Sequence, residues 1–154
     1  MKITAYRITK TKYASDAFSG EGARLTGGRW NPIGSRMVYL ASSLSLATLE
    51  LFVHTEDHAM LMRLFSYLPI TFDSKLIETP KPKDLPKGWD SPEIMASTQI
   101  YGGDWLRSKR SHVLAVPSAV TQSEVNYLLN PEHPDFSKIK IGKAVPFQLD
   151  PRLV

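Results

Sequence analysis

The chain has 154 residues, of which 42% are hydrophobic and 22% are charged. This composition excludes a disordered chain, and the length predicts a single domain over residues 1–154. Cysteine is absent, which excludes disulfides, thiolate zinc sites and a cysteine nucleophile. The net charge of +4 favours anionic partners in general, but the lysines are scattered along the chain and indicate an ordinary solvated surface.

The first residues lack the apolar core of a secretory signal peptide, so a cytoplasmic protein is expected. The apolar stretch from Met37 to Val53 is nearly long enough to span a bilayer. It nevertheless contains four serine or threonine hydroxyls and Glu50. It is therefore predicted to be a buried protein segment, and no membrane contact is expected.

The first half of the chain predicts a strand, a loop, a second strand and a helix. Alternating residues favour an opening strand over 2–8. Residues 19–36 are rich in glycine and carry three arginines, a pattern typical of a loop that brings cations and bare backbone close to a ligand. Residues 37–40 predict a short buried strand, after which Ser42 or Ser43 can cap a helix that runs to about His54.

Glu50 is the only ionisable acid or base between Met37 and Val53. On the predicted helix, Leu46, Leu49 and Val53 lie four residues before, one before and three after it, so we expect Glu50 to point inward or into a cleft. A carboxylate in apolar surroundings costs several kcal/mol unless a cation or hydrogen-bond donors meet it. Glu50 is therefore a candidate for chemistry.

The second half predicts more strands than helices. Alternation indicates a strand over 61–72 with one face made by Met62, Leu64, Leu68 and Ile70. The proline- and lysine-rich stretch 79–90 predicts an exposed connection. Pro92 predicts a helix start, with helices over 92–98 and 104–108. Further strands are predicted over 113–116, 139–141 and 145–149. The mixed order favours an α+β domain over a doubly wound sheet.

Two common site patterns have little support. Neither a G-x-G-x-x-G nor a P-loop pattern occurs, so hydride-transfer Rossmann and P-loop functions lack a sequence basis. His54 and His58 are spaced so that they could face one metal ion, but the glutamate of the zincin pattern is missing. A solvated helix end is favoured there, and no metal is expected.

Several motifs occur in a fixed order along nearly the whole chain. They are Y-R at 6–7, G-G-R-W-N at 27–31, V-Y-L-A at 38–41, the helix with Glu50, V-P-S-A-V at 116–120 and N-Y-L-L-N-P-E-H-P-D-F at 126–136. In this order they resemble the RES domain, the toxin half of RES-Xre toxin–antitoxin pairs. The resemblance implies a split, mainly antiparallel β core similar to that of ADP-ribosyltransferase toxins. It also implies an enzyme that consumes NAD by cleaving the bond between nicotinamide and ribose.

Carried over by motif position, the resemblance implies active-site roles for Arg29, Tyr39, Glu50 and Ser118, with Arg7 as a further active-site arginine. Its substrate would be NAD, and its acceptor water, phosphate or a protein side chain. The implied partner is an Xre-type helix-turn-helix antitoxin that occludes the active site, so DNA binding would belong to the complex. Growth arrest would follow from the loss of NAD.

The chemistry of the same residues agrees with these roles. Guanidinium groups of Arg7 and Arg29 suit a pyrophosphate, and Tyr39 could stack on the nicotinamide ring. Glu50 could stabilise positive charge that develops on the ribose. Ser118 would hydrogen-bond the nicotinamide carboxamide or the ribose, since no histidine is placed to activate it as a nucleophile. Each residue also has a purely structural alternative, as a loop arginine, a core tyrosine, a glutamate at the rim or a turn serine.

Two other functions stay open at this point. Within the same class, the chain could transfer ADP-ribose to a protein target. From a different class, a basic RNA-binding or RNA-cleaving module is supported by the positive charge and by Trp30, Tyr101 and Trp105 as stacking surfaces. The lack of one clustered basic stripe weighs against that module.

Overall fold

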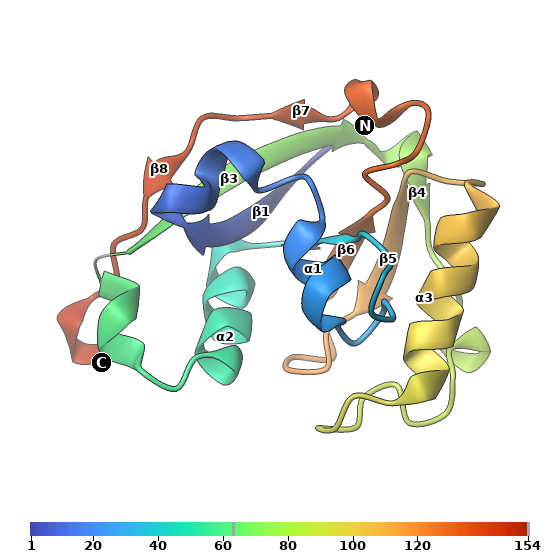
Figure 1. The fold of residues 1–154 in the computed structure, drawn as a ribbon, viewed down its shortest axis with the longest axis horizontal. Helices are drawn as coiled ribbons and strands as arrows, with labels where there is room; N and C mark the ends of the chain where they lie inside the picture. The colour runs from blue at the N-terminus through green and yellow to red at the C-terminus, as the bar shows by residue number, and fades with distance from the viewer. Residues whose placement is uncertain (63, 154) are drawn as a thin grey trace.

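The computed structural model describes residues 1–62 and 64–153 (Figure 1). Its α-helices are α1 (Glu21–Thr26), α2 (Leu44–His54) and α3 (Ala96–Ser108). Its strands are β1 (Lys2–Lys10), β2 (Val38–Ala41), β3 (Phe65–Asp73), β4 (Ile77–Glu78), β5 (Val113–Pro117), β6 (Val125–Leu129), β7 (Lys140–Ile141) and β8 (Val145–Pro146). In these residues, no helix is both long and apolar enough to cross a membrane.

The strands form one sheet in the order β4-β5-β6-β2-β1-β3-β7, and β8 also pairs with β3. Only the β4–β5 pair is parallel among the described strand pairs. The other pairs are antiparallel, and most join strands that are far apart in the sequence. This arrangement confirms the predicted α+β class.

The sheet is nearly divided between β1 and β2. β1 pairs with β3 along its whole length, from Lys2↔Asp73 to Lys10↔Phe65, but it meets β2 only at Tyr6↔Ala41. The β1–β3 half therefore turns away from the half that contains β2, β6, β5 and β4, as Figure 1 shows. This is the split, mainly antiparallel core that the sequence resemblance implied.

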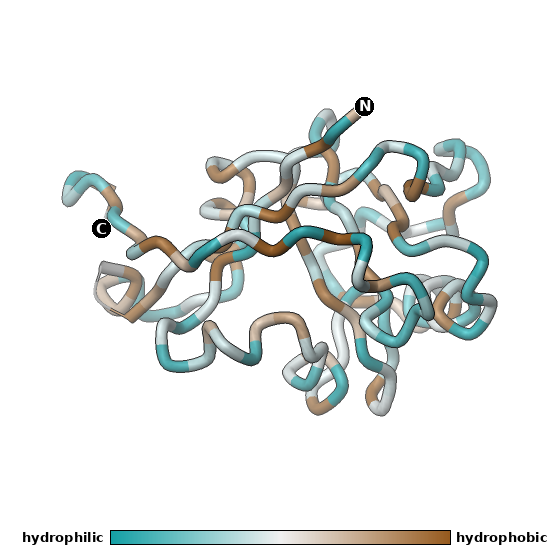
Figure 2. The backbone as a smooth tube through the Cα atoms, turned by 90° about the horizontal axis from the view of Figure 1, so that it is seen from above, coloured by the Kyte–Doolittle hydropathy of each residue, from teal (hydrophilic) through white to brown (hydrophobic). Residues whose placement is uncertain are grey.

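Apolar side chains fill both faces of the second half of the sheet. Val113 and Leu114 are neighbours on β5 and point to opposite faces, yet both are fully buried. Val113 belongs to a cluster shared with β1 and β3, whereas Leu114 packs with Trp30 and Trp105 beneath α3. Coverage on both sides explains why β5 is a continuous apolar run and not an alternating one. Figure 2 shows hydrophobic and hydrophilic stretches alternating along the backbone, with hydrophilic residues at many of the outer turns.

Helix α2 begins and ends as predicted, but its buried face is different. Ser43 caps it by accepting a hydrogen bond from the Leu46 amide at 3.0 Å. Leu46 is buried, whereas Leu49 and Val53 are 46% and 62% exposed. The predicted apolar face was wrong because the helix packs through Leu46 and the small Ala47 against Ala41 at the sheet split. Those distant contacts, not helical spacing alone, set its rotation.

Two further predictions need correction. The strand predicted over 61–72 starts at Phe65, because the preceding residues form a 3-10 turn over His58–Met62. Leu68 and Ile70 are buried as expected, but Leu64 is 45% exposed. The predicted inward direction of the Met62 side chain, and residue 63, lie outside the described residues.

The helices predicted over 92–98 and 104–108 are one helix, α3, and Pro92 lies in the loop before it. Gly102 and Gly103 interrupt the apolar pattern, yet both lie within the helix, where the Trp30 backbone packs directly on Gly102 and Pro32 packs on Gly103. A methyl group at Gly102 would lie 1.6 Å from the Trp30 carbonyl oxygen. The sequence prediction also missed α1, β4 and β6, which are short or polar.

We predict that Gly102→Ala lowers the free energy of unfolding by about 3 kcal/mol, because the added methyl group must push α3 away from the Trp30 backbone. The measurement is urea denaturation followed by circular dichroism. Gly22→Ala is the matched control, since a methyl group at this helical glycine meets no atom within 4 Å. It should raise stability by about 0.5–1 kcal/mol. Equal effects of the two substitutions would contradict the close contact.

Candidate active site

Glu50 is held by two donors that bind the same carboxylate oxygen. The Ser118 hydroxyl donates to Oε1 at 2.7 Å, and the Asn126 side-chain amide donates to it at 2.8 Å. Oε2 accepts no hydrogen bond from the described part of the chain. Glu50 is half-buried at the sheet-facing side of α2. One oxygen is thus fixed, and the other is available to a ligand.

The Ser118 side chain is fully buried just beyond β5. Its oxygen accepts hydrogen bonds from the amides of Val120 and Thr121, at 3.0 and 3.1 Å. These bonds leave its hydrogen to point at Glu50, so Ser118 donates to the carboxylate and orients it. Direct contact between Ser118 and a ligand, expected from the sequence, would require these bonds to be exchanged.

Strand pairing brings Asn126 to Glu50. Asn126 lies opposite Ala41 of β2 on one side and Val116 of β5 on the other. Ser118 follows Val116 by two residues and so continues the same face. In the sequence, Asn126 was noted only as the first residue of the motif at 126–136. Had the 125–129 run been predicted as the hairpin partner of β5, this register would have placed Asn126 beside Ser118.

Arg7 lies where β1 separates from β2. Its Nη1 donates to the carbonyl oxygen of Tyr39 at 3.2 Å, and its Nε is buried without an acceptor. Within residues 1–62 and 64–153, no carboxylate forms an ion pair with it. Burial lowers the pKa of Arg7 to about 10, so it still carries its charge at neutral pH. A half-buried cation without a carboxylate partner in the described residues favours an anionic ligand.

Tyr39 holds the glycine-rich loop in place. Its hydroxyl donates to Asn31 Oδ1 at 2.6 Å and accepts from the Trp30 amide at 3.0 Å. Asn31 is fully buried and donates in turn to the carbonyls of Ala23 and Ser35. Burial raises the pKa of the Tyr39 phenol well above its usual range. The hydroxyl therefore holds the glycine-rich loop in place. Stacking of the Tyr39 ring on nicotinamide remains a prediction.

Arg29 extends from this loop to a second one. Its Nη1 donates to the backbone carbonyls of Trp89 and Ser91, at 2.9 and 2.6 Å. The predicted residues thus form two groups, with Glu50 and Ser118 in one and Arg7, Tyr39 and Arg29 around the start of β2 in the other. In the described residues no hydrogen bond joins the two groups directly, but β2 connects them.

A hollow of about 290 Å³ lies elsewhere, between the end of α3 and the turn after β6. It is lined by Arg36, Arg107, Lys109 and Glu132, among others, and includes none of the five predicted residues. Arg36 and Arg107 already pair with carboxylates, which reduces their attraction for an added anion. The oriented carboxylate of Glu50 and the buried charge of Arg7 make the region around β2 the stronger candidate.

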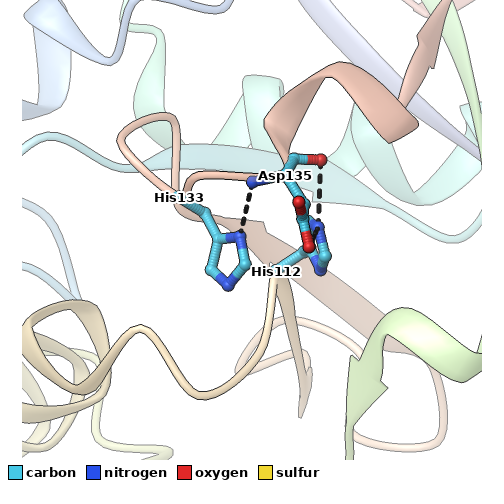
Figure 3. A group of neighbouring side chains, drawn as sticks. All are labelled: His112, His133 and Asp135. Carbon is cyan, nitrogen blue, oxygen red and sulfur yellow. Dashed lines mark hydrogen bonds and ion pairs between the residues drawn. The ribbon is translucent and has the colours of Figure 1, made fainter.

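His112, His133 and Asp135 form a group that could in principle hold a metal ion (Figure 3). The two rings are stacked, with centroids 4.0 Å apart and planes 33° from parallel. His112 Nε2 donates to the Asp135 carbonyl, and both His133 nitrogens bond the backbone, at Asp135 and Lys109. A metal ion must lie in the plane of each ligand ring, and the hydrogen bonds of both rings would have to break before it could bind. The geometry therefore fits a hydrogen-bonded pair of histidines better than a metal site.

The hydrogen-bonded group of His112, His133 and Asp135 predicts that the stability of the fold depends on pH. Burial, with help from His133, lowers the pKa of His112, so the unfolded chain takes up a proton first as the pH falls below about 6.5. The free energy of unfolding should therefore drop between about pH 6.5 and 5, by at most about 1.4 kcal/mol per pH unit for this proton. Urea denaturation across pH 5–8 measures the drop.

His112→Gln should flatten that pH dependence, because glutamine keeps a donor for the Asp135 carbonyl but does not titrate there. His54→Gln is the control, since His54 is exposed at the end of α2. It should keep the wild-type curve. If the free energy of unfolding of His112→Gln varied with pH as in wild type, His112 would not be the source of the pH dependence.

Comparison with known proteins identifies relatives along nearly the whole chain. The family profile described as RES domain matches residues 4–150. "Toxin Res" of Photorhabdus laumondii is 41% identical, over 97% of this chain and 96% of the relative. "Toxin Res" of Yersinia enterocolitica is 40% identical, over 96% and 97%. "Prs ADP-ribosylating toxin" of a Sphingobium species is 38% identical, over 92% of this chain and 89% of the relative.

Proposed function

Because this chain belongs to the RES domain family, we propose that it is a bacterial toxin that degrades NAD in the cytoplasm and thereby arrests growth. The reaction is cleavage of the bond between nicotinamide and ribose, with water or phosphate as the acceptor. The observation that carries the proposal is Glu50, whose Oε1 is fixed by Ser118 and Asn126 while Oε2 stays open.

The chemistry of this cleavage needs a fixed negative charge. Nicotinamide leaves as a neutral ring, taking the electron pair of the glycosidic bond, so neither a general acid nor a metal is required. The ribose is left with a positive charge spread over C1 and the ring oxygen. A carboxylate held beside it stabilises that charge without reorganising during the reaction. Glu50 then orients the acceptor or removes its proton.

The remaining residues suit the rest of the NAD molecule. The pyrophosphate carries two negative charges, and Arg7 offers a half-buried guanidinium without a carboxylate partner in the described residues. Arg29 can add a second guanidinium if it leaves the carbonyls of Trp89 and Ser91. Tyr39 fixes the glycine-rich loop that carries Arg29. It remains our candidate for contact with nicotinamide.

An antitoxin partner follows from the toxin assignment. The relatives named as toxins support a cognate inhibitor, and we propose an Xre-type helix-turn-helix protein that occludes the site around Glu50. A free toxin that consumes NAD would stop the cell that makes it. Nucleic-acid binding is assigned to that partner and not to this chain.

Transfer of ADP-ribose to a protein is the alternative, and a specific observation favours it. A relative that is 38% identical is named as an ADP-ribosylating toxin. Transfer of ADP-ribose differs from hydrolysis only in the group that attacks the ribose once nicotinamide has left. An RNA-binding or RNA-cleaving function has lost support, because Trp30 and Trp105 are fully buried and cannot stack on bases.

We expect Glu50→Gln to lower NAD turnover by about 100- to 1,000-fold, because the amide keeps the shape but not the charge of the carboxylate. Chromatography of the products after incubation with NAD measures both the rate and the acceptor. Glu56→Gln is the matched control, because Glu56 is exposed just beyond α2, and it should behave as wild type. Unchanged NAD with wild-type protein free of antitoxin would overturn the cleavage reaction. Equal rates for Glu50→Gln and wild type would remove Glu50 from its role.

Arg7→Met should weaken NAD binding by about 10- to 100-fold through loss of a charge-assisted contact with the pyrophosphate. Its free energy of unfolding should fall by no more than about 1–3 kcal/mol, because methionine leaves the Tyr39 carbonyl without its hydrogen bond but also removes a cation that has no carboxylate partner in the described residues. Calorimetric titration in the Glu50→Gln background avoids turnover. Arg152→Met, at an exposed position, is the control. Unchanged affinity in Arg7→Met would exclude Arg7 from the binding site.

A further inference from the structure

Asn126 is an unusual residue for its position. β6 lies between β5 and β2, so Asn126 is in the interior of the sheet. Asparagine is depleted in strands, where apolar and β-branched residues are preferred. Its neighbours across the strands are Ala41 and Val116, both buried apolar residues. Neither strand formation nor core packing accounts for an asparagine here.

The hydrogen bonds of Asn126 serve only one partner. Nδ2 donates to Glu50 Oε1, whereas Oδ1 is buried and accepts no hydrogen bond in the described residues. A buried acceptor without a donor destabilises the fold. The amide therefore has one favourable contact, to Glu50, and one unfavourable feature that an apolar side chain would remove.

Ser118 differs from Asn126 in this respect. Its hydroxyl also binds Glu50 Oε1, but it accepts two backbone amides of the turn that follows β5. Removal of that hydroxyl would leave the amides of Val120 and Thr121 without their partner. Ser118 thus combines a structural role with its contact to Glu50, whereas Asn126 has only the contact.

We propose that Asn126 is a positioning residue that holds the Glu50 carboxylate in its reactive orientation at the expense of fold stability. Two donors fix Oε1, one on β6 and one just beyond β5, so Oε2 is aimed at one point and the side chain does not sample several rotamers. With the hydrogen bond from Ser118 alone, the carboxylate can pivot about that one hydrogen bond and Oε2 can change its position. The proposal rests on the proposed function only in that the reaction at Oε2 is taken to be NAD cleavage.

The test compares Asn126→Leu with Asn130→Leu. Asn130 is buried, and its amide donates to the Leu106 carbonyl while its oxygen accepts from the Glu132 amide, so both of its ends are satisfied. We expect Asn126→Leu to have a melting temperature equal to or above wild type, with kcat for NAD about 10- to 100-fold lower and KM little changed. Asn130→Leu should lose stability and keep kcat in its folded fraction.

Asn126→Asp adds a readout that a purely structural role would not give. Aspartate has nearly the same shape, but it donates to Glu50 only when it is protonated. Relative to wild type, its activity should therefore rise as the pH is lowered from 8 to 5.5. A pH profile parallel to that of wild type would overturn the proposal, as would Asn126→Leu with wild-type kcat or with a loss of stability as large as that of Asn130→Leu.

Two further measurements separate this proposal from the proposed function. A crystal structure of Asn126→Leu should show Glu50 in more than one rotamer, and an unmoved carboxylate would overturn the positioning role whatever the substrate is. Growth arrest on expression in cells is the second. Arrest that needs Glu50 and Asn126, with NAD untouched, would refute NAD cleavage and support the positioning role. Arrest that needs Glu50 but not Asn126 would refute the positioning role.

Discussion

The single backbone pairing of Tyr6 with Ala41 is the point on which both halves of the site depend. Beyond it β1 and β2 separate, and the edge of β2 that faces β1 receives no further strand pairs there. A polar group must satisfy that edge, and Arg7 does so by donating to the Tyr39 carbonyl. On the other side of the same pair, Ala41 is small enough for α2 to pack closely through Ala47, which brings Glu50 to the sheet. One short contact thus places a half-buried cation and an oriented carboxylate on either side of β2.

The energetic cost of this arrangement comes from buried polar atoms without hydrogen bonds, and most of these lie near the candidate active site. Three buried side-chain polar atoms have no hydrogen-bond partner in the described residues, and two of them are Arg7 Nε and Asn126 Oδ1. These two belong to β1 and β6, the strands on either side of β2. An unsatisfied buried polar atom typically costs about 1–3 kcal/mol. Apolar clusters on both faces of the sheet must offset that cost, and natural proteins accept such conflicts mainly where function requires them.

The sequence predicted what local signals determine. Ser43 caps α2 because its hydroxyl reaches an amide three residues on, and Glu50 was conspicuous because its neighbours in the sequence are apolar. The rotation of α2 was missed, because it depends on contacts with β1 and β2. The role of Asn126 was missed because β6 contains a polar residue that strand propensity disfavours. The continuity of α3 through Gly102 was missed because only the backbone at Trp30 explains a glycine there. The misses at α2 and α3 share one cause, a contact between segments that are distant in the chain.

In the proposed reaction, the choice of acceptor is separate from the cleavage step at Glu50. Departure of nicotinamide needs only a fixed negative charge beside the ribose, so hydrolysis, phosphorolysis and protein modification share this step. Leu49 and Val53 are exposed one turn apart on α2, next to Glu50. An apolar surface of this kind suits a protein partner and contributes nothing to the binding of water or phosphate. An antitoxin and a protein substrate would both use it, so the surface does not distinguish inhibition from modification. The chemical identity of the product does, because only transfer leaves ADP-ribose attached to protein.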